Sequence, residues 1–212
     1  MSLLNEISIF LQQGRAKNVK EAVQKALDEG MEAKDILNKG LLDGMNIIGE
    51  KFKKNQVYVP EVLIAAKAMY AGMDILKPIL TETGVESAGK VVIGTVKGDL
   101  HDIGKNLVKM MMEGRGLEVI DLGIDVAPEE FIEAAKEHNA KIIACSALLT
   151  TTMTQMKKVV ELTIEHGIRD QVTIMVGGAP VTDNFCKSIG ADIYTPDAAS
   201  AAEAAARVCE TA

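Results

Sequence analysis

The sequence predicts an α/β protein in two parts, a group of helices followed by a doubly wound parallel sheet. Two observations carry this prediction. Apolar residues recur at helical spacing from Ser2 to about Leu80, and beyond residue 90 five short apolar runs alternate with helical stretches. The chain has 212 residues, of which 48% are hydrophobic and only 3% aromatic, so an aliphatic core large enough for two modest domains can form.

Residues 1–80 are expected to form a four-helix bundle. One stripe joins Leu37, Leu41, Met45, Ile48 and Phe52, whose steps of four, four, three and four place them on a single helix face. Pro78 is expected to end the fourth helix. The residues that predict helix boundaries are Gly14, Gly30, Asn55, Pro60 and Pro78. Four amphipathic helices of this kind favour a bundle.

Residues 81–90, with the sequence TETGVESAGK, are polar, contain glycine and have no apolar stripe, so they are predicted to be a linker. The domain that follows is expected over residues 91–212. Its apolar runs are expected to be strands buried on both faces of a parallel sheet, at residues 91–96, 117–122, 142–146, 172–176 and 192–194. The expected strand order is flavodoxin-like (Rossmann-like), 2-1-3-4-5, with right-handed crossovers.

This topology predicts where a ligand would bind. Open parallel sheets bind ligands beyond the carboxyl ends of their strands, where the strand order reverses. In the expected order, that point lies between the first and third strands. The informative loops are therefore residues 97–104 and 146–152, with the loop after the fourth strand beside them.

The first of these loops holds one of the three histidines of the chain. Asp99 lies two residues before His101, so its carboxylate can bind one imidazole nitrogen, fix the tautomer and raise the basicity of the ring. The pattern is typical of a metal-ligating or general-base histidine. Taken alone, this motif is better explained by a solvated histidine in a polar turn, with Asp102 capping the next helix.

The other loops at the same edge add weak signals of their own. Residues 146–152 contain four hydroxyl side chains, more than a helix cap needs. Gly177 and Gly178 allow a ligand to approach the backbone closely, although an ordinary tight turn would also use them. The fifth loop contributes Tyr194, Thr195, Pro196, Asp197 and Ala198. Their common placement indicates one extended crevice.

Other α/β sites fit less well. The first loop is neither G-x-G-x-x-G nor a P-loop, which argues against a nucleotide phosphate. The third strand ends in Cys145 and Ser146, where a phospho-receiver would have an aspartate. A Ser or Cys hydrolase is possible on composition, but neither residue lies in a G-x-S-x-G elbow. One histidine ligand beside a long glycine-lined crevice fits better.

Charge and composition exclude further classes. With 23 Lys plus Arg against 30 Asp plus Glu, the net charge is −7, and no basic cluster offers the footprint that nucleic acid needs. The N-terminus has no signal-peptide pattern, and no apolar run approaches the roughly 20 residues that span a bilayer. The three scattered cysteines favour reduced thiols. A cytoplasmic protein without a nucleic-acid or membrane partner is expected.

Together the loops resemble a known family. Asp99-x-His101-x-x-Gly104, then Ser146-x-Leu148, then Gly177-Gly178 is similar to the D-x-H-x-x-G, S-x-L, G-G signature of the cobalamin-binding domains of methionine synthase and of corrinoid methyl-carrier proteins. The helical half resembles the cap that precedes this domain in the same proteins, through LDGMN at 42–46, IG at 48–49 and YVPE at 58–61. The resemblance covers nearly the whole chain.

The resemblance implies a role for individual residues. His101 would be the lower axial ligand of cobalt and Asp99 its hydrogen-bond partner, with Thr152 where the family has a serine as the third member. Tyr58 on the cap would shield the upper face. The other implied cofactor contacts are Gly98, Asp102, Ile103, Gly104, Ser146, Leu148, Thr150, Gly177, Gly178, Tyr194, Asp197 and Ala198.

The implied function is that of a corrinoid protein carrying a methyl group on cobalt, with methylcobalamin formed during turnover. A substrate-specific methyltransferase would load it, a second would unload it to tetrahydrofolate or a thiol, and a reductive activase is a further candidate partner. A substrate-binding barrel needs about 250 residues, so the chain is expected to be a methyl-carrier subunit rather than a stand-alone enzyme. The methyl donor stays open among methylamines, methanol, betaines and methoxylated aromatics.

Two alternatives remain. One is a subunit of a cobalamin-dependent mutase, although mutase modules do not usually carry this cap. The other is a cobalamin-sensing regulatory protein, which would need an output domain. The helical half carries the cap pattern and offers no basic recognition helix for DNA.

Overall fold

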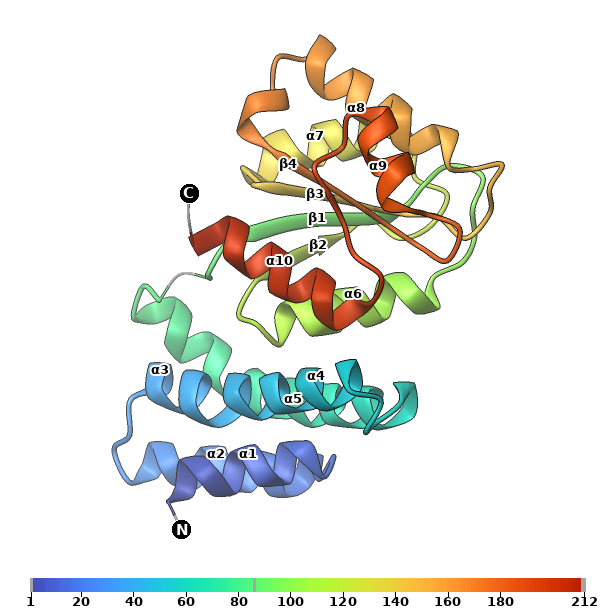
Figure 1. The fold of residues 1–212 in the computed structure, drawn as a ribbon. Helices are drawn as coiled ribbons and strands as arrows, with labels where there is room; N and C mark the ends of the chain where they lie inside the picture. Colours follow the sequence, from blue (N-terminus) through green and yellow to red (C-terminus); the bar gives the residue numbers. More distant parts are fainter. Residues whose placement is uncertain (1, 86, 211–212) are drawn as a thin grey trace. The chain divides into compact units, whose positions relative to one another are not determined.

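The structure is a computed structural model that describes residues 2–85 and 87–210 (Figure 1). The chain divides into two compact units. One contains Met1–Ser87 together with Gly114–Gly116 and is called the helical unit; the other contains Ala88–Glu113 and Leu117–Ala212 and is called the sheet unit.

The helical unit is built from four helical rods around an aliphatic core. The third rod is a continuous helix that widens into a π-turn in its middle, a feature that the apolar stripe does not predict. The bounds are α1 Leu3–Gln12, α2 Ala16–Asp28, α3 Ala33–Ile36, the π-turn η1 Leu37–Leu42, α4 Asp43–Lys53 and α5 Val59–Glu82 (Figure 1). Its fully buried side chains include Ile7, Leu11, Ile36, Leu41, Ile48 and Leu76.

Most of the expected helix boundaries are found, and one is wrong. Gly14 and Gly30 follow α1 and α2, and Pro60 lies in the first turn of α5, where its missing N–H costs no hydrogen bond. The helix does not end at Pro78 but continues to Glu82. Leu76 and Leu80 are buried on either side of the proline, and this packing offsets the hydrogen bond that Pro78 removes. The connection to the sheet therefore begins after Glu82, with residue 86 outside the described residues.

The sheet unit has five parallel strands in the order β2-β1-β3-β4-β5, which confirms the predicted topology. The strands are β1 Lys90–Thr95, β2 Glu118–Asp121, β3 Ile142–Ser146, β4 Thr173–Gly177 and β5 Ile193–Tyr194. In the parallel register Thr95 pairs with Ser146, and Ser146 pairs with Gly177. The carboxyl ends of the three central strands therefore lie side by side.

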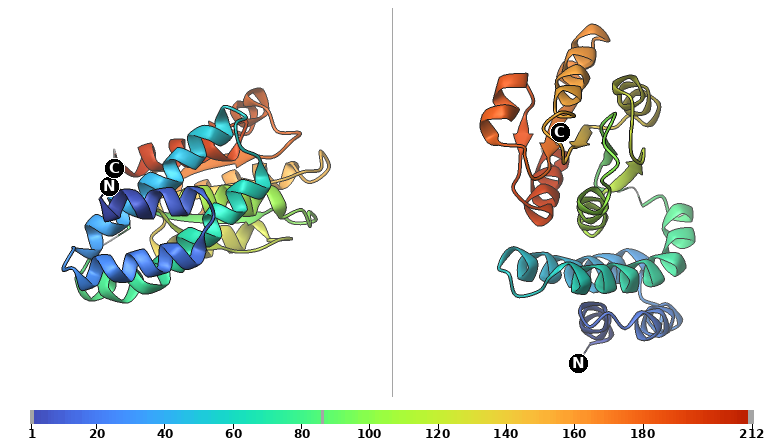
Figure 2. Two further views of the ribbon diagram at one scale, coloured as in Figure 1. Left: turned by 90° about the horizontal axis from the view of Figure 1, so that it is seen from below. Right: turned by 90° about the vertical axis from the view of Figure 1, so that its right-hand side faces the viewer.

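Helices cover both faces of this sheet. Helices α6 and α10 lie on one face, and α7, α8 and α9 lie on the other (Figures 1 and 2). Their bounds, with a short 3-10 turn η2, are α6 Ile103–Glu113, α7 Pro128–His138, α8 Thr154–Glu165, η2 Arg169–Gln171, α9 Asp183–Ile189 and α10 Ala198–Glu210. Strands β1 and β3 are buried along almost their whole length, which explains why they read as continuous apolar runs. Across residues 2–85 and 87–210, no helix is both long enough and apolar enough to cross a membrane.

Candidate functional site

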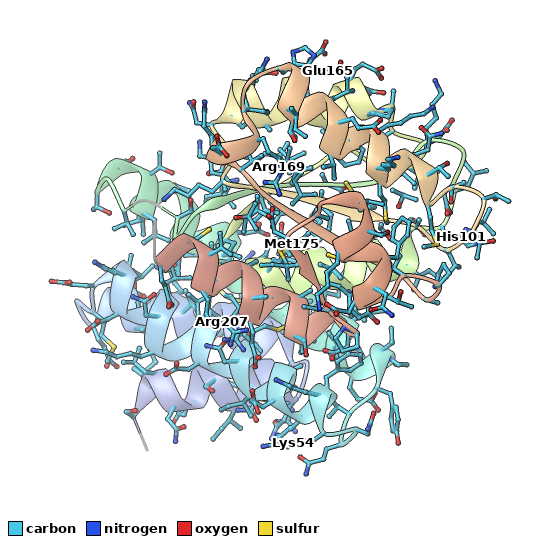
Figure 3. All side chains as sticks on the ribbon, turned by 45° about the horizontal axis from the view of Figure 1, so that its top comes forward. Lys54, His101, Glu165, Arg169, Met175 and Arg207 are labelled. Atoms are coloured by element: carbon cyan, nitrogen blue, oxygen red, sulfur yellow. The ribbon has the colours of Figure 1, made fainter. Side chains whose placement is uncertain are left out.

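The β1–α6 loop places an imidazole against a buried carboxylate. Asp99 Oδ1 lies 2.7 Å from His101 Nδ1 and also accepts the backbone N–H of His101 at 3.2 Å. Asp99 is fully buried, whereas 51% of the His101 side chain is exposed at the edge of the sheet unit (Figure 3). Because Asp99 engages Nδ1, Nε2 is the nitrogen that can bind a metal ion.

The second carboxylate oxygen of Asp99 joins this loop to the β3–α8 loop. Oδ2 accepts the N–H groups of Leu148 at 2.8 Å and Leu149 at 3.1 Å, and the Thr152 hydroxyl at 2.8 Å. Burial alone would raise the pKa of Asp99, but the hydrogen bonds from His101, Leu148 and Thr152 outweigh it and hold that pKa well below its usual range. Asp99 therefore stays ionised and provides a fixed acceptor for the imidazole.

Thr95, the last residue of β1, holds the backbone of His101 in place. Thr95 is fully buried, and its hydroxyl donates a hydrogen bond of 2.8 Å to the carbonyl oxygen of His101. The sequence gives no sign of this role, because a threonine in an apolar strand is an ordinary β-former. The sequence also does not reveal the roles of the Leu149 amide and the Asp125 carboxylate, because their partners lie on another loop.

The two glycines after β4 differ in their surroundings. Gly178 has a φ of +129°, and a Cβ placed there would lie 1.8 Å from the carbonyl oxygen of Ala147. A Cβ on Gly177 would meet no heavy atom within 4 Å. Gly178 thus permits the close approach of the β3–α8 loop, whereas the space beside Gly177 is open to a ligand.

Exposed apolar side chains gather in the loops at the carboxyl ends of the strands. They are Leu100, Ile103, Ile124, Leu148 and Leu149, each between 42% and 74% exposed. Exposed apolar groups concentrated in this way mark a binding surface. The site thus offers an imidazole nitrogen that can bind a metal ion, open space at a glycine and an apolar rim. These features fit a flat macrocycle that carries a metal ion.

The remaining predicted site residues have local roles in the structure. Ser146 ends β3, Tyr194 ends β5, and Thr150 is exposed in the β3–α8 loop. Asp197 accepts the N–H and the hydroxyl of Ser200 at 2.8 Å each, just before Ala198 begins α10. Three more of the predicted residues lie at the start of α6. Asp102 precedes the helix and accepts a hydrogen bond of 3.1 Å from the side-chain amide of Asn106, and Ile103 and Gly104 are the first two residues of the helix. Their contacts with a cofactor stay predictions.

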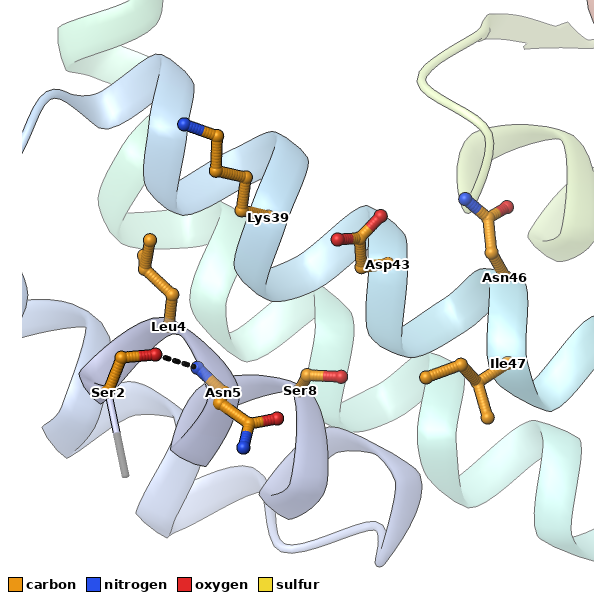
Figure 4. A pocket seen from close by; sticks show the side chains of 8 residues that line it. All are labelled: Ser2, Leu4, Asn5, Ser8, Lys39, Asp43, Asn46 and Ile47. Carbon is orange, nitrogen blue, oxygen red and sulfur yellow. Dashed lines mark hydrogen bonds between the residues drawn. The ribbon is translucent and has the colours of Figure 1, made fainter.

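Tyr58 belongs to the helical unit, where it precedes α5 and is 64% exposed. The same unit has a pocket of about 520 Å³ (Figure 4). It is lined by Ser2, Leu4, Asn5, Ser8, Lys39, Asp43, Asn46 and Ile47, none of which was predicted to bind the cofactor. The shielding role of Tyr58 stays a prediction.

Burial makes the thiol of Cys145, the residue before the last of β3, a poor nucleophile. Cys145 is buried, and burial raises the pKa of its thiol to about 12. A cysteine protonated at physiological pH lacks the thiolate that nucleophilic catalysis requires. This argues against the cysteine hydrolase that composition alone leaves possible.

An ion pair fixes the first turns of α6, directly after the histidine loop. The ammonium of Lys105, only 2% exposed, lies 2.5 Å from Asp121 Oδ1 on β2, and Lys109 lies 3.3 Å from Oδ2. Burial would raise the pKa of Asp121, but the hydrogen bonds from Lys105 and Gly123 and the charges of both lysines lower it.

Replacing Asp121 by asparagine is expected to cost about 2 kcal/mol of unfolding free energy at pH 7, because the buried ammonium of Lys105 loses its charged partner. Since the folded-state pKa of Asp121 is depressed, its contribution exists above the unfolded pKa of about 4 and disappears as the pH falls through the folded value. Urea unfolding of both proteins at several pH values between about 7 and about 2.5 should give free energies of unfolding that converge in acid. The exposed Asp170→Asn is the control, and a gap that persists in acid would contradict the assignment.

Comparisons with known proteins find matches to both parts of the chain. Residues 89–206 match a family described as B12 binding domain, and residues 3–77 match a second family with the same description. A corrinoid protein of Desulfitobacterium hafniense is 40% identical over 211 residues, covering 98% of each chain. Dimethylamine corrinoid protein 2 of Methanosarcina acetivorans is 45% identical over 202 residues, covering 94% of this chain and 92% of that protein.

A solved structure extends the comparison. A chain in the crystal structure of the methanol:cobalamin methyltransferase complex from Methanosarcina barkeri superposes with a TM-score of 0.89 at 29% identity, covering 99% of this chain and 80% of that one. The family and the cofactor class predicted from the loops are confirmed by these matches. The chain therefore belongs to the B12-binding corrinoid proteins, with a helical part and a sheet part that each match a B12-binding family.

Proposed function

We propose that this chain carries a methyl group between methyltransferases on a bound corrinoid, whose cobalt His101 would hold through Nε2. The observation that carries the proposal is the half-exposed imidazole of His101 held 2.7 Å from the fully buried carboxylate of Asp99. The bound corrinoid supplies a cobalt centre that accepts and releases a methyl group.

The protein's own residues prepare the ligand. Asp99 keeps a proton on Nδ1 of His101, which fixes the tautomer and leaves the lone pair of Nε2 available. The Thr152 hydroxyl and the loop amides hold Asp99 in place, so the imidazole needs little reorganisation when it binds. The exposed apolar side chains would exclude water around a bound corrin ring, and the open space at Gly177 would leave room for the nucleotide tail of the cofactor.

The named relatives support the methyl donor and the loading partner of this proposal. The similarity to dimethylamine corrinoid protein 2 supports a methylamine as the methyl donor. The matched methanol:cobalamin methyltransferase complex supports a substrate-specific methyltransferase as the loading partner. A second methyltransferase that delivers the methyl group to tetrahydrofolate or a thiol, a reductive activase, a cytoplasmic location and shielding of the upper face by Tyr58 complete the proposal.

Replacing His101 by alanine tests the ligand. The wild-type protein loaded with cobalamin should have the absorption spectrum of a form in which histidine has displaced the cofactor's benzimidazole, and His101→Ala should lose it because no other group replaces Nε2. His138→Ala is the matched control, since His138 ends α7. An unchanged spectrum in His101→Ala would refute the ligand assignment.

The carrier role has its own test with the same holoprotein. The methylated protein should keep its methyl group until a partner methyltransferase is added, and then lose it. Autonomous turnover of a methyl donor by the isolated chain would contradict the carrier role while leaving the His101 ligand intact.

A further inference from the structure

The β2–α7 loop contains a residue in an unusual backbone conformation. Asp125 has a φ of +54°, and the only other non-glycine residues with positive φ among those the structure describes are Asn55 and Asn139. Those two asparagines follow helices, where the left-handed conformation is common. Asp125 ends no helix, so its conformation needs another explanation.

Asp125 forms two hydrogen bonds to the loop that carries the proposed ligand. Its Oδ1 accepts the N–H of Gly98 at 2.6 Å. Its own N–H donates to the carbonyl oxygen of Asp99 at 3.0 Å. The two bonds bracket the Gly98–Asp99 peptide, and Asp125 makes both of them, one through its side chain and one through its main chain, in the left-handed backbone conformation.

These contacts act on the part of the loop where position matters most. Asp99 must place one oxygen at His101 Nδ1 and the other at the amides of the β3–α8 loop, so a small displacement of its backbone disturbs both sets. Its N–H also donates to the carbonyl oxygen of Val96 at 3.1 Å, which fixes one side of the turn. Asp125 fixes the other side. The side chain of Asp125 is exposed and contributes nothing to the core.

We infer that Asp125 is a positioning residue, which acts through the backbone of Gly98 and Asp99 to hold the Asp99 carboxylate against His101 and thereby sets how firmly His101 binds cobalt. This inference rests on the proposed function. Replacing a residue that forms a hydrogen bond to a metal-binding histidine lowers metal affinity by about 10–100-fold. Asp125 acts one step further out, so the lower end of that range is expected.

Two substitutions separate the contribution of the Asp125 carboxylate from that of its backbone conformation. Asp125→Gly keeps the left-handed conformation without strain and removes only the acceptor for Gly98. Asp125→Asn keeps an acceptor oxygen and also tolerates positive φ. The probe is diaquocobinamide, a corrinoid without the nucleotide tail, so that its affinity depends on the bond between His101 and cobalt. Asp125→Gly should bind it about tenfold more weakly than wild type, while Asp125→Asn should restore most of the affinity.

A second measurement uses the protein without corrinoid. In wild type labelled with nitrogen-15 histidine, the NMR signals of His101 should be those of the tautomer protonated at Nδ1. In Asp125→Gly the chemical shifts of His101 should move toward those of a mixture of the two tautomers, while the signals of His138 and His166 stay unchanged. A residue that merely stabilised the fold would lower the unfolding temperature without changing the tautomer.

His101→Ala, measured beside these variants, separates the possible failures. If His101→Ala loses affinity for diaquocobinamide but Asp125→Gly binds like wild type, the positioning role is overturned and the proposed function stands. If His101→Ala binds like wild type, the ligand assignment fails and the inference fails with it. An unfolded Asp125→Gly also overturns the inference, since a positioning role predicts a folded protein with a weakened ligand.

Discussion

Replacing Gly178 by alanine is expected to lower the unfolding free energy by about 3 kcal/mol or more. A left-handed or extended positive φ costs a non-glycine residue about 1–3 kcal/mol, and Gly178 has a φ of +129°. The new Cβ would also lie 1.8 Å from the carbonyl oxygen and 2.9 Å from the carbonyl carbon of Ala147, which are backbone atoms that cannot rotate away. Urea denaturation measures the loss.

Gly177→Ala is the matched control for this change. Its Cβ would meet no heavy atom within 4 Å, so stability should stay within about 0.5 kcal/mol of wild type. Under the proposed function the same methyl group enters the space for the nucleotide tail, and cobalamin affinity should fall although the fold is intact. Equal stability of the two variants would contradict the structural distinction between the glycines.

Asp99→Ala is expected to cost about 3 kcal/mol of unfolding free energy, because it removes a fully buried acceptor that joins the β1–α6 and β3–α8 loops, and leaves two part-buried amides and the imidazole N–H without their partner. The carboxylate accepts the amides of Leu148 and Leu149, the Thr152 hydroxyl and His101 Nδ1 from a fully buried position. The variant should also lose the histidine-ligated spectrum, since nothing then orients the imidazole. Thermal unfolding of the protein without corrinoid and the absorption spectrum of the loaded protein measure the two effects separately.

A nearby carboxylate provides the comparison. The side chain of Asp102 is exposed and accepts one hydrogen bond, from the side chain of Asn106, so Asp102→Ala should cost at most about 1 kcal/mol and leave the histidine-ligated spectrum as in wild type. Equal effects of the two substitutions would mean that the loop is held by its general charge rather than by the buried acceptor at Asp99.

The sequence was sufficient to predict the sheet and the edge at which the site lies. Buried parallel strands appear as apolar runs between helices, and no strand end differs from its predicted position by more than one residue, as between 117–122 and Glu118–Asp121. Pro78 was misjudged because the local preference of a proline cannot reveal the packing of Leu76 and Leu80 on either side of it. The π-turn within the third rod was missed because an apolar stripe fits both helix types.

The candidate site was predictable where its residues are close in sequence. Asp99 and His101 are two positions apart, so their hydrogen bond could be expected from spacing. The bond from Gly98 to Asp125 joins residues 27 positions apart on separate loops, and no periodicity reports such a contact. Neighbouring glycines 177 and 178 look alike in sequence, and only the fold separates a steric requirement from an open space.

The most direct test of the account is the electron paramagnetic resonance spectrum of the cobalt(II) holoprotein with nitrogen-15 histidine. Natural nitrogen from a lower axial ligand splits each cobalt line into three, and nitrogen-15 splits it into two. If His101 binds cobalt, the labelled protein should give the two-line pattern, and His101→Ala should lose it. A labelled wild-type protein that keeps the three-line pattern would show that the nitrogen comes from the cofactor's own base, and it would contradict the central claim.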